Sequence, residues 1–105
     1  MVKMVVLLVR EESLSYEEFL TYWEEEHVPM VEALPDVRRY VTSHPTDPEK
    51  SAYDGVAEVY FDDMDELGAA FESEAGQALQ ADAAEFTDPE AGAVLYMDER
   101  EQFVA

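Results

Sequence analysis

The sequence predicts an α+β domain, an antiparallel sheet that carries helices on one of its faces. Apolar segments typical of strands alternate with capped segments of helical periodicity, in the order β-α-β-β-α-β. This order is that of the ferredoxin-like arrangement. The chain has 105 residues and no cysteine, so we expect a single domain over residues 1–105 that folds without disulfides.

Four segments have the composition of strands. Val2–Val9 is an almost continuous apolar run, which predicts a central strand covered on both faces. Val37–Ser43, Gly55–Phe61 and about Ala93–Asp98 are the other three, each bounded by turn-forming or charged residues.

The first helix has a clear start and an ambiguous end. Ser15 and Glu18 have the spacing of a capping box, which predicts a helix from about Tyr16. Pro29 has no N–H to donate and disfavours helical backbone at the residue before it, so we expect the helix to end or kink near His27.

The second helical region is expected in two pieces. Asp63 and Glu66 form another capping box, for a short helix to about Glu72. Ser73 can cap the following helix, which is expected to run through Glu85.

One layer of helices covers only one face of a sheet, and the first predicted strand is apolar on both faces. Two such sheets packed face to face in a twofold dimer would cover the other face. The pattern therefore predicts a homodimer.

The charge is extreme, with 26 acidic residues, 6 basic residues and a formal net charge of -20. Such a chain repels nucleic acid, so we expect no nucleic-acid partner. Acidic residues occur along the whole chain rather than in one patch, which favours a solvated acidic surface suited to high salt, where self-repulsion is screened.

The longest apolar run, Met4–Val9, is far shorter than the roughly 20 residues of a membrane span. We expect a cytoplasmic, halophilic protein with no membrane partner.

The candidate site is a stripe at helical spacing formed by Phe19, Tyr22, Trp23, His27 and Met30. A histidine on this apolar stripe is suited to general acid/base catalysis, because its unperturbed pKa is near neutrality. Burial favours the neutral ring, whereas the helix C-terminus and neighbouring glutamates favour the imidazolium. The alternative is a buried histidine that only bonds backbone groups at the helix end.

Three further aromatic side chains are candidates to bind an apolar ligand. Tyr22 and Trp23 could form a pocket wall, although an aromatic stripe of this kind is also typical of core packing. Tyr40 could donate a hydrogen bond to the ligand, or could simply lie on an outward-facing strand surface. His44, at the end of the same strand, is expected to be exposed.

Glu58 is the fourth candidate ligand-binding residue, and its role depends on which sheet face it occupies. If that face meets the helices, Glu58 and Asp54 could accept a proton or orient His27. If it is the opposite face, Glu58 is expected to pair with Arg10 or Arg39, because a buried carboxylate is costly without a partner.

Two segments resemble the EthD family, a branch of the dimeric α/β-barrel superfamily: Phe19-x2-Tyr22-Trp23-x3-His27-x-Pro29 and Asp54-Gly55-Val56-Ala57-Glu58-x-x-Phe61-Asp62. The phenylalanine-ended helix before Asp88-Pro89 extends the resemblance over nearly the whole chain. The resemblance implies a homodimer whose two sheets close a shared barrel, with a pocket between sheet and helices in each subunit. Relatives of the family include cofactor-independent enzymes that act on small ring compounds, such as a methylmuconolactone isomerase and polyketide-modifying proteins.

We therefore expect an EthD-like protein that is either a cofactor-independent enzyme or an accessory oxidoreductase. Its substrate would be a small cyclic or aromatic compound and its acid/base would be His27, in an oxidoreductase or isomerase reaction. The alternative is a noncatalytic binding or stress-type dimeric module. No cofactor is expected, because the four glycines are isolated and form no nucleotide-binding pattern. No metal is expected, because two histidines on separate elements give no diagnostic ligand spacing.

Overall fold

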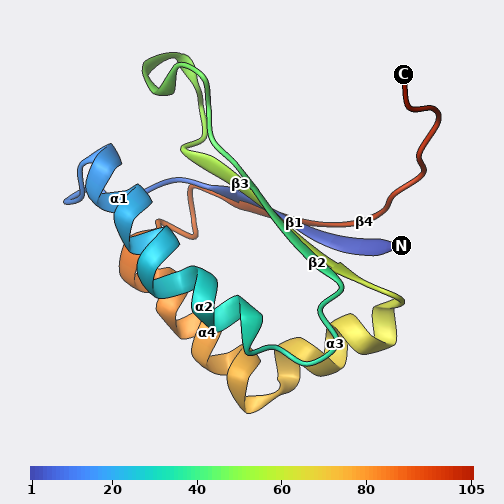
Figure 1. Ribbon diagram of the computed structural model, residues 1–105. Helices are drawn as coiled ribbons and strands as arrows, with labels where there is room; N and C mark the ends of the chain where they lie inside the picture. Colours follow the sequence, from blue (N-terminus) through green and yellow to red (C-terminus); the bar gives the residue numbers. More distant parts are fainter.

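A computed structural model describes residues 1–105 of the chain. Four strands form one antiparallel sheet in the order β2-β3-β1-β4, and the helices lie on one side of it (Figure 1). The elements are β1 (Val2–Leu8), α1 (Tyr16–Tyr22), a π-helical turn (Trp23–His27), α2 (Val28–Glu32), β2 (Arg39–Ser43), a 3₁₀ turn (Pro48–Lys50), β3 (Gly55–Phe61), α3 (Met64–Glu72), α4 (Glu74–Phe86) and β4 (Ala93–Asp98). The α+β class, the ferredoxin-like order and the central position of β1 are confirmed.

The caps fall where the sequence predicts them. The Ser15 side chain accepts from the amide of Glu18, whose own carboxylate accepts from the amide of Ser15. Asp63 caps α3 and Ser73 caps α4, each side chain accepting from an amide three residues on. The box expected of Asp63 and Glu66 is only half formed, because Glu66 does not accept from the amide of Asp63 in return. Each such cap is worth about 1 kcal/mol, because it satisfies an amide that the helix itself cannot pair.

The expectation was that the first helix ends or kinks near His27; it does not end there, but its hydrogen-bond register changes in a π-helical turn that closes at His27. The amide of Val28 donates to the carbonyl of Trp23, five residues back, and the chain continues as helix to Glu32. A proline at position 29 would clash with the carbonyl four residues earlier in a regular α-helix. A π-helical turn just before the proline changes that register, which lets the helix pass through Pro29.

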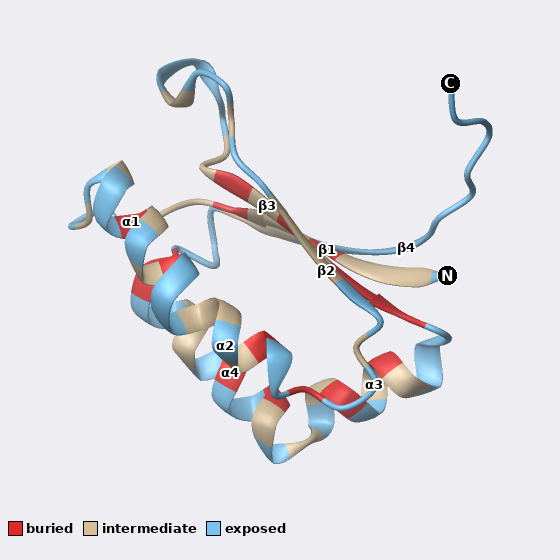
Figure 2. Cartoon of the chain, in the orientation of Figure 1, coloured by how far each residue is buried: buried red, intermediate tan, exposed pale blue.

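The core lies between the helices and the inner face of the sheet, as the distribution of buried residues in Figure 2 shows. Trp23 and Phe19 are at most 1% exposed and pack against each other with ring centroids 5.6 Å apart. The Trp23 indole lies directly on β3, where a Cβ atom added at Gly55 would be 2.4 Å from the ring. Only glycine leaves room for this contact. It holds the N-terminal end of the π-helical turn against the sheet.

The outer face of the sheet has no helix over it, and the edge strand β4 is exposed. Its side chains Leu95 and Met97 lie on the outer face and are 41% and 47% exposed, whereas Val94 and Tyr96 lie on the inner face. An apolar surface of this kind is typical of an interaction site rather than of a solvated face. After β4 the tail runs away from the sheet (Figure 1) and ends with two exposed apolar residues, Phe103 and Val104. None of the helices is long and apolar enough to cross a bilayer.

Candidate functional site

His27 is the last residue of the π-helical turn, and its side chain is only 11% exposed. Its Nδ1 atom lies 2.8 Å from Oδ2 of Asp82 on α4, and its ring packs against Phe86 at 4.9 Å. Burial lowers the pKa of His27, and the hydrogen bond and negative charge of Asp82 oppose that shift without cancelling it. The imidazole is therefore neutral near pH 7, with Nδ1–H donating to the carboxylate and Nε2 left as an acceptor.

Asp82 belongs to the candidate site, although the sequence analysis did not single it out. Its two oxygens divide between two partners, since Oδ2 bonds His27 and Oδ1 accepts from the hydroxyl of Tyr22 at 2.6 Å. That hydrogen bond is the main cause that raises the pKa of Tyr22 to about 12, so Tyr22 stays a donor. Its spacing in the sequence indicates an inward position: Asp82 lies three residues after Leu79 and four before Phe86, so it shares the apolar face of its helix.

Tyr22 therefore does not contact the pocket described below. It holds the carboxylate that orients His27, and its ring packs on Phe86 at 5.0 Å. The carboxylate that interacts with His27 is thus Asp82 of the second helical region, rather than a glutamate neighbouring His27 in the sequence.

Trp23 and Tyr40 are joined by a hydrogen bond between the π-helical turn and β2. The indole Nε1–H donates to the Tyr40 hydroxyl at 3.1 Å. Tyr40 pairs with Val59 of β3 on the inner face of the sheet, beneath the helices. Burial raises the pKa of Tyr40, so its hydroxyl stays protonated. Because that oxygen already accepts from Trp23, its own proton remains free to donate to a ligand.

His27, Trp23 and Tyr40 all lie in the wall of one cavity of about 340 Å³ between the sheet and the helices. Hydrophobic residues make up 16 of its 22 lining residues, and the lining comes from all four strands, the π-helical turn, α2, α3, α4 and the loop before β4. The volume is in the range of pockets that bind small organic molecules. The cavity thus combines an apolar interior with one imidazole and the phenols of Tyr40 and Tyr96.

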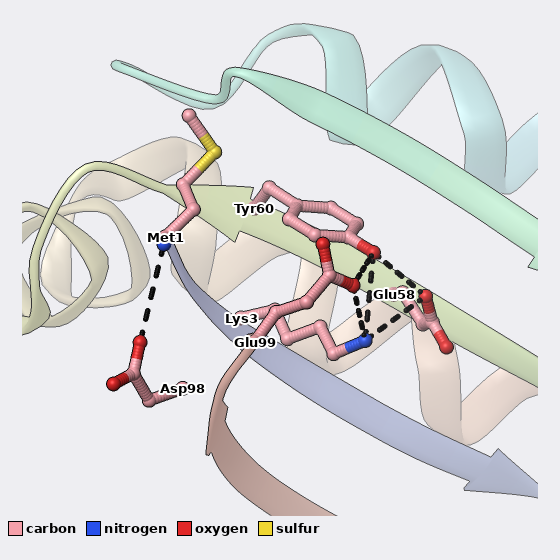
Figure 3. A network of polar contacts seen from close by, with 6 residues as sticks. All are labelled: Met1, Lys3, Glu58, Tyr60, Asp98 and Glu99. Atoms are coloured by element: carbon pink, nitrogen blue, oxygen red, sulfur yellow. Dashed lines mark hydrogen bonds and ion pairs between the residues drawn. The ribbon is translucent and has the colours of Figure 1, made fainter. Parts of the chain in front are cut away.

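Glu58 lies on the other face of the sheet, away from this cavity, because its neighbours Ala57 and Val59 point to the helices. There it accepts from Lys3 at 3.4 Å and from the hydroxyl of Tyr60 at 3.1 Å (Figure 3). Tyr60 also donates to Glu99 at 2.8 Å. Glu58 therefore neither lines the pocket nor orients His27.

The expected partners of Glu58 were also wrong, since its cation is Lys3 rather than an arginine. Arg10 instead pairs with Asp54 at 3.7 Å, and its amide donates to the same carboxylate. Asp54 is therefore bound to Arg10 and does not orient His27. His44 is exposed, as expected, and meets the edge of the Trp23 ring at 5.2 Å. No group of three or more histidine, cysteine, aspartate or glutamate side chains is arranged to hold a metal ion.

The fold and the cavity define a ferredoxin-like α+β protein in which a histidine bonded to a carboxylate lines a mainly apolar pocket. Residues 11–90 match the model of the EthD domain. The chain therefore belongs to the EthD family.

One curated relative is a Rhodococcus erythropolis protein described as an uncharacterized 11.0 kDa protein in the thcB-thcC intergenic region. It is 35% identical over 71 residues, 65% of this chain and 68% of the relative. Among solved structures, an ethyl tert-butyl ether D (EthD) family protein from Bacillus halodurans is 24% identical, with a TM-score of 0.83 over 95% of this chain and 99% of the other.

Two more distant structures share the fold. A dimeric protein of unknown function with a ferredoxin-like fold, from Bacteroides fragilis, is 20% identical, with a TM-score of 0.70 over 93% of this chain and 95% of the other. SnoaB, a cofactor-independent oxygenase from Streptomyces nogalater, is 13% identical, with a TM-score of 0.72 over 96% and 94%.

Proposed function

We propose that this EthD-family chain is a cofactor-independent enzyme that transfers a proton to or from a small cyclic or aromatic compound. The observation that carries the proposal is the Asp82–His27 pair, whose imidazole lines an apolar cavity large enough for a ring compound. The likeness of its fold to SnoaB, a cofactor-independent oxygenase, supports the same class of chemistry.

His27 would act as the general base. Its Nε2 takes a proton from an O–H or C–H group of the ligand, and the imidazolium that forms is stabilised by Asp82. Tyr40 would hold an oxygen of the ligand through its free hydroxyl proton, and Trp23 would pack against the ring. His27 then returns the proton as the general acid.

Proton removal is the first step of two reactions. An isomerase returns the proton to a different atom of the ring, whereas an oxygenase lets the ring anion react with dioxygen. Both use the same Asp82–His27 pair and neither needs a further residue of this chain for the proton transfer.

A homodimer is the second part of the proposal. The uncovered outer face carries Leu95 and Met97 of β4, which are 41% and 47% exposed, and a structural neighbour is described as a dimeric protein with a ferredoxin-like fold. Packing two outer faces together would bury these side chains and close a barrel between the sheets. The cavities lie on the opposite, helical side, so each protomer would keep its own.

The test is turnover of hydroxylated naphthalenes and unsaturated lactones, followed by absorbance. Replacing His27 with alanine is expected to lower the rate by about 10²–10⁴-fold, the usual contribution of a general acid or base. The matched control is His44→Ala, the only other histidine, which is exposed and outside the cavity. Turnover that His27→Ala leaves intact contradicts the proposal. Binding of these compounds with no turnover would make the chain a noncatalytic binding module.

A further inference from the structure

We propose that the cavity selects its ligand by charge: it takes neutral rings that carry a hydroxyl group and rejects carboxylates and phosphates. This assignment rests on the proposed function, because it gives a ligand class to the same cavity. It goes further by excluding the anionic ring acids of similar size and shape.

The cavity wall contains no cation. Neither lysine nor arginine is among the 22 residues that line it, and the one carboxylate in the wall is the exposed Asp88. A carboxylate ligand would lose its hydration inside an apolar cavity and would find no positive partner there. Burying an unpaired charge in this way is strongly unfavourable.

The few basic side chains of the chain are held elsewhere. Lys3 is bound to Glu58 and Glu99 on the outer face of the sheet (Figure 3), and Arg39 lies over the ring of Tyr60 on the same face. The other four pair with nearby carboxylates: Arg10 with Asp54, Arg38 with Asp62, Lys50 with Asp47 and Arg100 with Asp98. All six are therefore committed to contacts outside the cavity.

The polar groups in the cavity complement a hydroxyl rather than an acid anion. His27 offers an acceptor at Nε2, since Nδ1 is held by Asp82, and Tyr40 offers one O–H donor, since its oxygen accepts from Trp23. The second phenol in the wall, that of Tyr96, is 59% exposed and can bond to solvent. A ligand with an O–H group satisfies His27, whereas a carboxylate brings only acceptors and would face the lone pair of that ring. A methoxy group in place of the hydroxyl would leave the imidazole without its hydrogen bond.

Three probes with the same ring system separate these effects at pH 7: 2-naphthol is neutral with a donor, 2-methoxynaphthalene is neutral without one, and 2-naphthoate is an anion. The chain has one tryptophan, and it lines the cavity. The single indole N–H resonance in a ¹H–¹⁵N spectrum therefore reports occupancy directly. We expect 2-naphthol to bind at least about tenfold more tightly than either of the other two probes, because one unmade hydrogen bond or one unpaired charge costs that much.

A lysine introduced into the cavity wall should increase the affinity for the anionic probe, 2-naphthoate. Ala83 lines the cavity from α4, whereas its neighbour Ala84 is exposed and does not. Ala83→Lys is expected to tighten 2-naphthoate binding about tenfold, the scale of one paired charge in a partly buried site. Ala84→Lys, which makes the same change in net charge, is expected to leave it unchanged. The comparison of the three probes in the unmodified protein does not depend on either variant folding.

The outcomes separate the two proposals. Absence of binding by all three probes would refute the proposed function itself. Binding of 2-naphthoate as tightly as 2-naphthol would overturn only the selection by charge, and equal binding of 2-methoxynaphthalene would overturn the role of the hydroxyl. Rejection of 2-naphthoate should persist in about 1 M salt, where the Debye length is about 3 Å. Its loss there would assign the effect to the net charge of the protein and overturn the assignment to the cavity.

Discussion

The Nδ1 atom of His27 lies 2.8 Å from Oδ2 of Asp82, although the two residues are 55 positions apart in the chain. The contact joins the π-helical turn to α4 and leaves Nε2 as the ring nitrogen that this carboxylate does not hold. A histidine held by a carboxylate in this way has a defined tautomer and orientation, which a general base requires.

The first prediction concerns the pKa of His27. Burial holds it below 6.5 in the folded protein despite Asp82. The unfolded chain therefore binds more protons, and the contribution of this group to the free energy of unfolding falls as pH drops from about 6.5 through the folded-state pKa. An NMR titration of the His27 ring should give a midpoint below 6.5, lower still in Asp82→Asn. A midpoint above 6.5 contradicts the burial argument.

The second prediction concerns the glycine under Trp23. A methyl group at Gly55 would meet the indole at 2.4 Å, so Gly55→Ala is expected to lower the free energy of unfolding by about 1–3 kcal/mol through overpacking. Gly68→Ala is the matched control: no atom lies within 4 Å of the added carbon, so a gain of up to about 1 kcal/mol is expected within α3. Chemical denaturation measures both. Equal effects of the two changes would disprove the close packing of Trp23.

The third prediction concerns the outer face. Leu95→Lys places a charge among the exposed apolar side chains of β4 and is expected to convert the proposed dimer to monomers in sedimentation experiments. Met64→Lys is the control, because Met64 is 48% exposed on α3, away from the sheet. A dimer that survives Leu95→Lys, or one that Met64→Lys also dissociates, places the interface elsewhere.

The fourth prediction concerns salt. A net charge of -20 on 105 residues destabilises the compact state by self-repulsion, and salt screens that repulsion. The melting temperature should rise from dilute buffer to about 1 M KCl, where the Debye length is about 3 Å. Choline chloride should act similarly, because screening does not depend on which cation binds. A melting temperature that changes with neither salt rules out an adaptation to high salt.

The local elements were predictable because their signals are local. The capping residues Ser15, Asp63 and Ser73 act within one helical turn, and each starts its helix where expected. Pro29 was misread for the opposite reason. The rule that a proline ends a helix assumes bonds to the fourth residue back, and the π-helical turn at Trp23 avoids that register.

The site was only half predictable. His27, Trp23 and Tyr40 could each be identified from the residue pattern of their own helix or strand, and all three line the cavity. Asp82 depends on how α4 packs against the first helix, which no short-range pattern encodes. Glu58 was ambiguous because both faces of its strand carry apolar residues, so alternation alone did not reveal which face meets the helices.

One measurement tests the central claim most directly: the long-range ¹H–¹⁵N spectrum of the two histidine rings during a titration with 2-naphthol at pH 7. Binding in the cavity should move the Nε2 resonance of His27 together with the indole resonance of Trp23. Movement of the Trp23 signal with no change at His27 would show that the ligand does not reach the imidazole. That result would contradict an acid/base role for the Asp82–His27 pair.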